Sequence, residues 1–113
     1  MRVLVTGASG YIGGQTAIQL KDQEHEVFGL DRDRLPDHVH ALDIFADFCQ
    51  FDFASDEALN WIARQRVDAI IHCAGTSLVG PSLANPEEYY NNNFVKTKKL
   101  IDHLLLSKWN GRF

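Results

Sequence analysis

The feature that most constrains the fold of this chain is a run of closely spaced glycines directly after an apolar segment, MRVLVTGASGYIGG. The segment RVLVT is typical of a buried strand, and the residues from Tyr11 to about Lys21 have a helical period. Gly7, Gly10 and Gly13 therefore occupy a strand-to-helix turn of the kind that binds phosphate. In such a turn the first glycine allows a sharp bend, the second lets backbone approach a pyrophosphate, and the third lets helix and strand pack closely. The alternative is a turn that packs tightly and binds nothing.

Residues on either side of this turn extend the prediction to a dinucleotide. The amides of Tyr11 and Ile12 start the expected helix, where N–H groups have no partner within the helix and can face a phosphate. Asp31 ends the next apolar run, EVFGLD, eighteen positions after the third glycine. An acid near that spacing accepts hydrogen bonds from ribose hydroxyls and repels a 2′-phosphate, which favours NAD. Arg32 and Arg34 argue in the other direction, because guanidinium groups accommodate the extra phosphate of NADP.

The rest of the chain alternates short apolar runs with segments of helical period, which predicts an α/β fold with a parallel sheet. Strands are expected at residues 2–6, 26–31, 47–52 and 68–74, and helices at about 11–21, at 56–64 and from 86 onward. The fourth strand is apolar enough to be buried on both faces. Right-handed crossovers then give a Rossmann-like sheet of about four strands, in the order 3-2-1-4, with helices on both faces. The ligand crevice is expected beyond the carboxyl ends of the first and fourth strands.

Several details of the helices can also be predicted. In the first helix, Ile12, Ala17, Ile18 and Leu20 are expected to face the sheet. The long helix has Asn85 as its expected N-cap, Pro86 at its first position and Glu88 to complete a capping box. The apolar stripe of this helix is Tyr90, Phe94, Thr97, Ile101, Leu104 and Leu105. Gly111 is expected to stop the helix, and Arg112 and Phe113 to begin a fifth strand.

Composition and charge exclude several classes of protein. The net charge is −4, and the one basic cluster, Lys96, Lys98 and Lys99, is typical of a solvated helix face, so no nucleic-acid partner is expected. The chain has neither a signal peptide nor an apolar run long enough to span a membrane, which favours a cytoplasmic protein. Cys49 and Cys73 lack the spacing of a zinc site or a disulfide framework, so we expect reduced thiols and no metal.

A family resemblance follows from the order of the motifs TGASGYIGG, LD, FDF, IIHCAG, VGPS and NPEEYYNNNFVKT. Together they resemble the extended short-chain dehydrogenase/reductases, most closely their UDP-glucose 4-epimerase branch, over essentially all of residues 1–113. The resemblance implies NAD as cofactor and a UDP-sugar as substrate, interconverted through a transient 4-keto sugar, in a full-length homodimer. Two alternatives stay open: a sugar-nucleotide dehydratase or reductase of the same family, and a dinucleotide-binding module without catalysis.

The resemblance also assigns roles to individual residues by matching position. Asp31 would bind the adenosine ribose, and Asp52 the adenine amino group with Phe53 beside it. Further cofactor contacts are implied for Cys73, Ala74, Gly75, Ser77 and one of Asn92 and Asn93. The motif places that asparagine at Asn92, whereas helical geometry puts Asn93 nearer the apolar stripe. Asp52 could instead only initiate a helix, and the asparagines could be a solvated helical turn.

The sequence departs from the family pattern at two positions. Ser77 stands where the 4-epimerases typically carry a lysine, and Lys96 stands where they carry a glycine or a small polar residue. The loop after Asp31 is also shorter than the epimerase pattern. These departures concern the identity of the substrate more than that of the cofactor.

The catalytic residues that the resemblance implies, a Ser or Thr and a Tyr-x-x-x-Lys pair, have no counterpart in this sequence. Tyr11, Tyr89 and Tyr90 are followed four positions later by glutamine, asparagine and phenylalanine. We therefore expect residues 1–113 to be one NAD-binding domain, the N-terminal part of such an enzyme, without catalytic residues and without a substrate domain. The fourth strand would then be an open sheet edge through which copies of the chain can associate.

Overall fold

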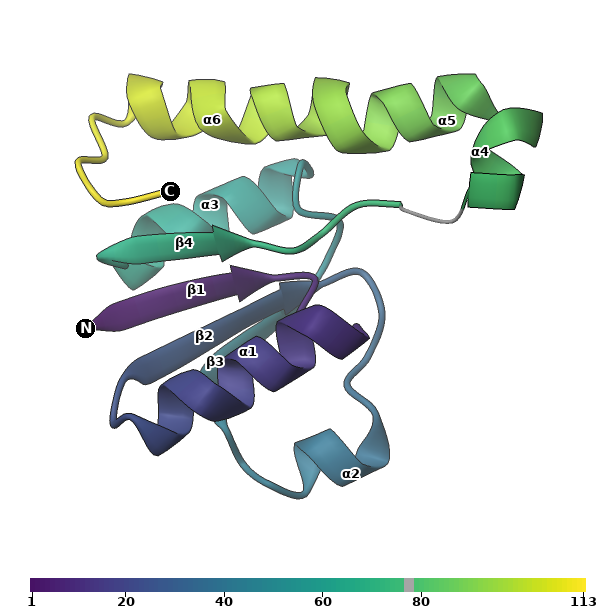
Figure 1. Ribbon diagram of the computed structural model, residues 1–113. Helices are drawn as coiled ribbons and strands as arrows, with labels where there is room; N and C mark the ends of the chain where they lie inside the picture. Colours follow the sequence, from purple (N-terminus) through teal and green to yellow (C-terminus); the bar gives the residue numbers. More distant parts are fainter. Residues whose placement is uncertain (77–78) are drawn as a thin grey trace.

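The structure is a computed structural model, and it describes residues 1–76 and 79–113 (Figure 1). In chain order its elements are β1 (Arg2–Thr6), α1 (Tyr11–Asp22), β2 (Glu26–Asp31), α2 (Asp37–His40), β3 (Phe45–Gln50), α3 (Asp56–Gln65), β4 (Ala69–His72), α4 (Val79–Ala84), α5 (Pro86–Tyr90), the π-helical turn η1 (Asn91–Val95) and α6 (Lys96–Leu106). The four strands form a parallel sheet in the order β3-β2-β1-β4. This confirms the predicted Rossmann-like topology.

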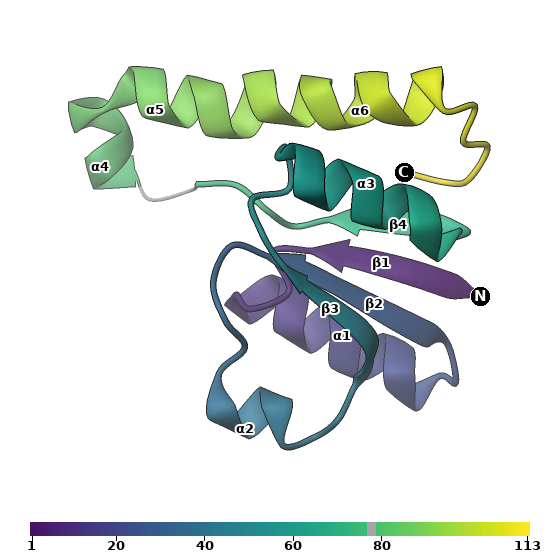
Figure 2. The same cartoon turned by 180° about the vertical axis from the view of Figure 1, so that it is seen from behind.

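Helices cover both faces of the sheet. Helices α1 and α2 lie against one face, and α3 together with the α5–α6 segment lies against the other (Figures 1 and 2). Side chains from alternate strand positions divide between two apolar clusters, as the period of a strand requires. The cluster beneath α3 and α6 includes Leu4, Phe28, Leu30, Ile70, Leu59, Ile62, Leu100 and Leu104. The cluster beneath α1 and α2 includes Val5, Val27, Ala8, Ala17, Val39 and Ile44. No helix in the described part of the chain is long and apolar enough to cross a membrane.

Three segments differ from the sequence expectation. The third strand spans Phe45–Gln50 rather than 47–52, because Asp52 leaves the ladder for a turn in which its Oδ1 accepts the Ala54 N–H at 2.9 Å. Within the expected loop after β2, residues 37–40 form the short helix α2, which begins behind Pro36. The VGPS motif also belongs to a helix, α4, instead of a loop.

The outer strand β4 is shorter and more exposed than expected. Its side chains are not buried on both faces, since Ile71 is 38% exposed on the side where α1 packs over β1 and β2. Ile12 of α1 is 64% exposed and so does not face the sheet, whereas Ala17 is fully buried. On the outer edge of β4, Ala69 forms an isolated parallel bridge with Arg112. The predicted first step of a fifth strand is therefore present.

The long helix faces the sheet with only part of the expected stripe. Leu104 is buried and Thr97 and Ile101 are partly buried, as expected, but Tyr90, Phe94 and Leu105 are more than half exposed. Leu100, which the expected stripe left out, is fully buried. Two apolar stripes run along this helix, so periodicity alone could not choose between them, and the turn η1 changes the helical phase at Asn91–Val95.

Both ends of the long helical segment also differ from expectation. Asn85 occupies the N-cap position of α5, but no side chain caps the helix there, so the capping box does not form. At the other end α6 stops at Leu106 rather than near Gly111. Lys108 adopts a left-handed conformation with φ of 58°, and the Trp109 N–H donates to the Leu104 carbonyl. This is the Schellman arrangement that commonly ends helices.

Candidate functional site

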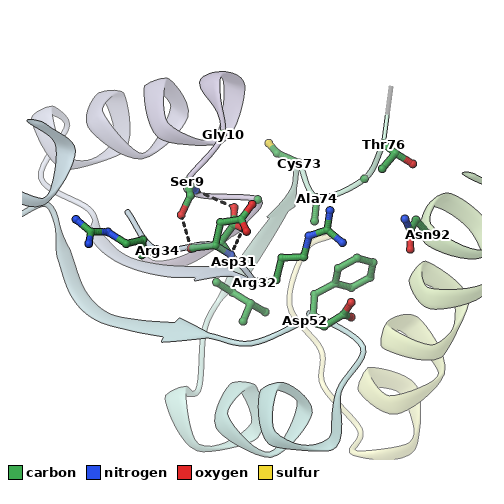
Figure 3. Close-up of a pocket in the computed structure, with 15 residues that line it drawn as sticks. Ser9, Gly10, Asp31, Arg32, Arg34, Asp52, Cys73, Ala74, Thr76 and Asn92 are labelled. Carbon is green, nitrogen blue, oxygen red and sulfur yellow. Dashed lines mark hydrogen bonds between the residues drawn. The ribbon is translucent and has the colours of Figure 1, made fainter. Parts of the chain in front are cut away.

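A pocket of about 280 Å³ opens at the carboxyl ends of the strands (Figure 3). There β1 and β4 lead to opposite faces of the sheet (Figure 1). Such a switch point is the usual ligand site of open parallel sheets. The lining residues are Gly7, Ser9, Gly10, Leu30, Asp31, Arg32, Asp33, Arg34, Asp52, Phe53, Cys73, Ala74, Gly75, Thr76 and Asn92. Figure 3 shows Ser9 and Asp31 on one side of the pocket, Thr76 and Asn92 on the other, and Arg32 extending between them.

The three glycines of the first turn have different structural reasons to be glycine. Gly7 has a φ of +68°, and a Cβ there would lie 2.7 Å from the backbone of Cys73 and Ala74. A Cβ on Gly13 would lie 2.1 Å from the carbonyl oxygen of Gly7. A Cβ on Gly10 would approach only that same oxygen, at 3.3 Å, although Gly10 borders the pocket. Packing therefore demands glycine at the first and third positions, while at Gly10 the space a side chain would take is open to a ligand.

The N-terminus of α1 borders the pocket beside this turn. Gly10 is the N-cap residue, and no side chain caps the first-turn amides. The side chains of Tyr11 and Ile12 are 82% and 64% exposed and do not line the pocket. Their contribution to a ligand would come from backbone N–H groups at the positive end of the helix dipole.

Asp31 closes one wall of the pocket by joining the glycine turn to the loop after β2. Its Oδ2 accepts the Ser9 N–H and its Oδ1 accepts the Asp33 N–H, both at 2.9 Å. The Ser9 hydroxyl in turn donates to the Asp33 carbonyl at 2.8 Å. Arg34 forms an ion pair with Asp37 rather than pointing at the carboxylate of Asp31. Each oxygen of Asp31 keeps further acceptor capacity, so the carboxylate can hold a pair of ligand hydroxyls.

On the opposite side of β2, Asp52 and Phe53 follow the end of β3. The Asp52 Oδ2 accepts a hydrogen bond at 2.6 Å from the Nζ of Lys96, which lies on α6. The side chain of Lys96 is 25% exposed to solvent and that of Asp52 is 32% exposed. Burial by itself would raise the pKa of Asp52, but the hydrogen bonds from Lys96 and Ala54 and the charges of Lys96 and Arg32 hold that pKa below its usual value. Lys96 is therefore not part of a solvated face, unlike the exposed Lys98 and Lys99.

A hydrogen-bonded network fixes the point where β4 leaves the sheet. The fully buried Thr6 hydroxyl accepts the N–H groups of Cys73 and Ala74 at 3.1 and 3.2 Å. Because both of its lone pairs are used, it donates its proton to His72 Nδ1 at 2.7 Å. His72 is then neutral and donates from Nε2 to the Thr97 hydroxyl at 3.1 Å. Burial lowers the pKa of His72, in agreement with this neutral form, and raises the pKa of the Cys73 thiol.

The two asparagines of the long helix have distinct positions, which the π-helical turn creates. Asn92 is 7% exposed and lines the pocket. Asn93 points to the β4 exit loop instead, where its Oδ1 accepts the Thr76 N–H at 2.8 Å and its Nδ2 donates to the Thr76 carbonyl at 2.7 Å. Gly75 has a φ of +155°, and a Cβ there would lie 2.8 Å from that Oδ1. Asn92 thus belongs to the pocket wall and Asn93 holds the loop beside it.

Most of the residues expected at the site lie together around this pocket. These are Gly7, Gly10, Asp31, Arg32, Asp52, Phe53, Cys73, Ala74, Gly75 and Asn92. Gly13, Tyr11, Ile12 and Asn93 lie next to the pocket without lining it, and Ser77 lies outside the described residues. The sequence interpretation did not assign Ser9, Leu30, Asp33 or Thr76. Ser9 could have been found as the polar one of the two residues between Gly7 and Gly10, while Thr76 is recognisable only once the position of Asn93 is known.

The pocket offers backbone amides at one end, the Asp31 carboxylate with spare acceptor capacity in the middle and the Asp52 carboxylate beyond it. Such a row of groups suits an extended, polar ligand that carries phosphate and hydroxyl groups. Within residues 1–76 and 79–113, no cluster of three or more His, Cys, Asp and Glu side chains could hold a metal ion.

Comparison with known proteins gives a family and several relatives. Residues 3–112 match the model of the NAD dependent epimerase/dehydratase family. A UDP-glucose 4-epimerase of Klebsiella pneumoniae is 41% identical, over 89% of this chain and 78% of that protein. A UDP-glucose 4-epimerase of Halalkalibacterium halodurans is 39% identical, over 91% of this chain but only 32% of that protein.

Solved structures resemble the fold closely. The UDP-glucose 4-epimerase of Bifidobacterium longum, solved in complex with NAD+ and UDP, superposes with a TM-score of 0.86 at 28% identity. The superposition covers 99% of this chain and 36% of that one. Apart from the Klebsiella protein, the chain therefore spans about a third of these relatives, on their N-terminal side.

Proposed function

The chain belongs to the NAD dependent epimerase/dehydratase family, and from this premise we propose that it is the NAD-binding part of an enzyme that interconverts UDP-hexoses by epimerisation at C4. The observation that carries the proposal is the pocket at the switch point of the sheet, where the glycine turn, Asp31, Asp52 and the end of β4 meet. The chemistry that bound NAD would supply in the full reaction is reversible hydride acceptance, which leaves no net oxidation of the sugar.

Different pocket residues would bind different parts of NAD. The open space at Gly10 and the first-turn amides of Tyr11 and Ile12 would receive the pyrophosphate. The adenosine ribose would lie on the carboxylate of Asp31, and the adenine amino group would donate to Asp52, with the ring of Phe53 beside it. Cys73, Ala74 and Gly75 would contact the cofactor through their backbone, with Asn92 on the opposite wall.

The charges around Asp31 favour NAD over NADP. A 2′-phosphate on the ribose would meet the carboxylate of Asp31 at close range. Arg34, which could neutralise such a phosphate, is paired with Asp37. Arg32 extends into the pocket toward the side where Asp52 lies (Figure 3), and there its charge acts on the Asp52 carboxylate.

The sugar chemistry needs residues that this sequence does not contain. In the proposed scheme a tyrosine base, held by the lysine four positions after it, removes the proton of the sugar hydroxyl as the hydride departs. No tyrosine among residues 1–113 has such a lysine. We therefore expect the 113-residue chain to bind NAD and to show no epimerase activity of its own.

We also propose that the protein self-associates as a homodimer and works in the cytoplasm. Support for a dimer comes from the outer face of the long helix, where Tyr90 and Phe94 stack at 5.2 Å and are both more than half exposed. Exposed Ile71 and the edge of β4 offer a second route for association. A reducing compartment suits the free thiols of Cys49 and Cys73.

Thermal denaturation with and without NAD tests the binding proposal. Saturation at about 100 times the dissociation constant stabilises a protein by roughly 2.7 kcal/mol, which raises the Tm of a domain of this length by about 10 °C. NADP should raise it less, and Gly10→Val should abolish the rise with NAD because its side chain fills the space left for phosphate. A wild-type chain whose Tm is unchanged by NAD would refute the proposal.

A further inference from the structure

Lys96 makes a contact with the proposed adenine end of the pocket that the family resemblance does not account for. Its Nζ lies 2.6 Å from Asp52 Oδ2, although the two residues are 44 positions apart in the sequence. The side chain of Lys96 is 25% exposed and that of Asp52 32%. A pair this well covered is held in place far better than a surface ion pair.

Lys96 lies on the same face of the long helix as the residue that lines the pocket, Asn92. Asn92, which lines the pocket, and Lys96 are four positions apart, and the next residues at this spacing, Leu100 and Leu104, are buried against the sheet. Residues four apart lie above one another on a helix. The packing of α6 therefore fixes the position of the Lys96 ammonium group relative to the pocket.

Two donors on different sides then hold the carboxylate of Asp52. Oδ1 accepts the Ala54 N–H at 2.9 Å, and Oδ2 accepts from Lys96. The turn is held further by Ser55, whose N–H and hydroxyl both donate to the Asp52 carbonyl. A carboxylate bound through both oxygens cannot rotate without breaking one of these bonds, but it keeps one lone pair on each oxygen for a ligand.

We infer that Lys96 is a specificity-determining residue, which orients Asp52 so that the pocket accepts a 6-aminopurine and rejects a 6-oxopurine. The inference rests on the proposed binding of NAD. An adenine amino group donates to the fixed carboxylate, whereas the carbonyl oxygen of hypoxanthine in the same position faces another acceptor. Hypoxanthine also carries an N1–H donor, but a carboxylate held by Lys96 cannot turn to meet it. Without Lys96, the Ala54 N–H is the one remaining donor to the Asp52 carboxylate among the described residues, and the carboxylate is free to turn.

The test compares the affinities of NAD and of nicotinamide hypoxanthine dinucleotide, measured by titration calorimetry on the 113-residue chain. The wild type should prefer NAD by about tenfold or more, the cost of one mismatched polar pair. Lys96→Met, which keeps an unbranched side chain without the ammonium group, should weaken NAD binding by roughly 3–10-fold and reduce the preference to about twofold. Lys96→Arg should keep most of the preference, because a guanidinium group can also hold the carboxylate.

Lys98→Met is the matched control, because it removes the same charge from an exposed pair with Asp102 on the same helix. It should leave the preference unchanged. Should Lys96→Met not fold, Lys96→Gln supplies the same measurement with a polar side chain that is shorter and uncharged. An unchanged preference in Lys96→Met, or an equal loss in Lys98→Met, would overturn the inference and leave NAD binding intact. A wild type that binds neither dinucleotide would overturn the inference together with the proposed function.

Discussion

Thr6→Val should lower the free energy of unfolding by more than the loss of a single hydrogen bond would, because the Thr6 hydroxyl bonds three groups. Valine keeps the volume of the fully buried side chain and suits a strand, so the change removes hydrogen bonds with little loss of packing. The Cys73 N–H keeps the Thr6 carbonyl at 3.2 Å, but the Ala74 N–H and His72 Nδ1 lose the partner that Thr6 supplies. At about 1–1.5 kcal/mol for each partly buried group left unpaired, the expected cost is roughly 2–3 kcal/mol.

Thermal and urea denaturation followed by circular dichroism would measure this cost. An unfolding entropy of about 2.1 cal/mol/K per residue converts the loss into a decrease in Tm of roughly 8–12 °C. Thr97→Val is the control, because it removes only the bond at the far end of the network, from His72 Nε2, at a half-buried position, and should cost about 1 kcal/mol or less. A Tm for Thr6→Val within about 3 °C of the wild type, or equal to that of Thr97→Val, would refute the role given to this network.

Two further predictions concern the same region. His72 has a pKa of 6.5 in the unfolded chain, and burial lowers this pKa in the folded state. The unfolded chain therefore binds the proton first as the pH falls. The free energy of unfolding should be at its full value above pH 6.5 and decrease below it, by at most about 1.4 kcal/mol per pH unit. His72→Phe should flatten this part of a stability–pH curve, and an identical curve would contradict the neutral form of His72. Gly13→Ala should lower the free energy of unfolding by more than about 2 kcal/mol, because its Cβ would lie 2.1 Å from the carbonyl oxygen of Gly7. Gly14→Ala should raise that free energy by roughly 0.5–1 kcal/mol, because its Cβ would have its closest contact at 3.5 Å and alanine favours a helix. Equal denaturation midpoints for these two variants would contradict the packing described for α1.

Three strands of the sheet, β1, β2 and β4, could be predicted because each is a short apolar run bounded by polar residues or glycine. The third strand, β3, includes Asp47 and Gln50, and its bounds could be predicted only to within two residues. The order of the strands then follows from the handedness of the crossovers, and the position of the pocket follows from the order. Gly7, Gly10 and Asp31 were assigned to the pocket because their spacing along the chain is itself the signal.

The remaining differences arise where tertiary contacts decide between local alternatives. The long helix carries two apolar stripes, and the sheet packs against Leu100 and Leu104 rather than against Ile101 and Leu105. This packing also explains why Lys96 contacts Asp52, because Lys96 lies on the same side of the helix as Asn92, Leu100 and Leu104. Once that side is known to face the sheet, the covered position of Lys96 could have been predicted. The contacts of Thr6 with His72 and of Asn93 with Thr76 join distant segments of the chain. No local pattern in the sequence indicates either contact.

The most direct test of the central claim, that the pocket binds NAD, is an amide-resolved NMR titration of the 113-residue chain. The proposed site predicts that NAD shifts the amide resonances of the glycine turn from Gly10 to Gly13, of Asp31 and Asp33, of Phe53 and Ala54, and of Ala74 and Gly75. AMP should reproduce the shifts near Asp31 and Phe53 but not those at Gly75. Shifts confined to other surfaces, or no shifts at saturating NAD, would contradict the claim.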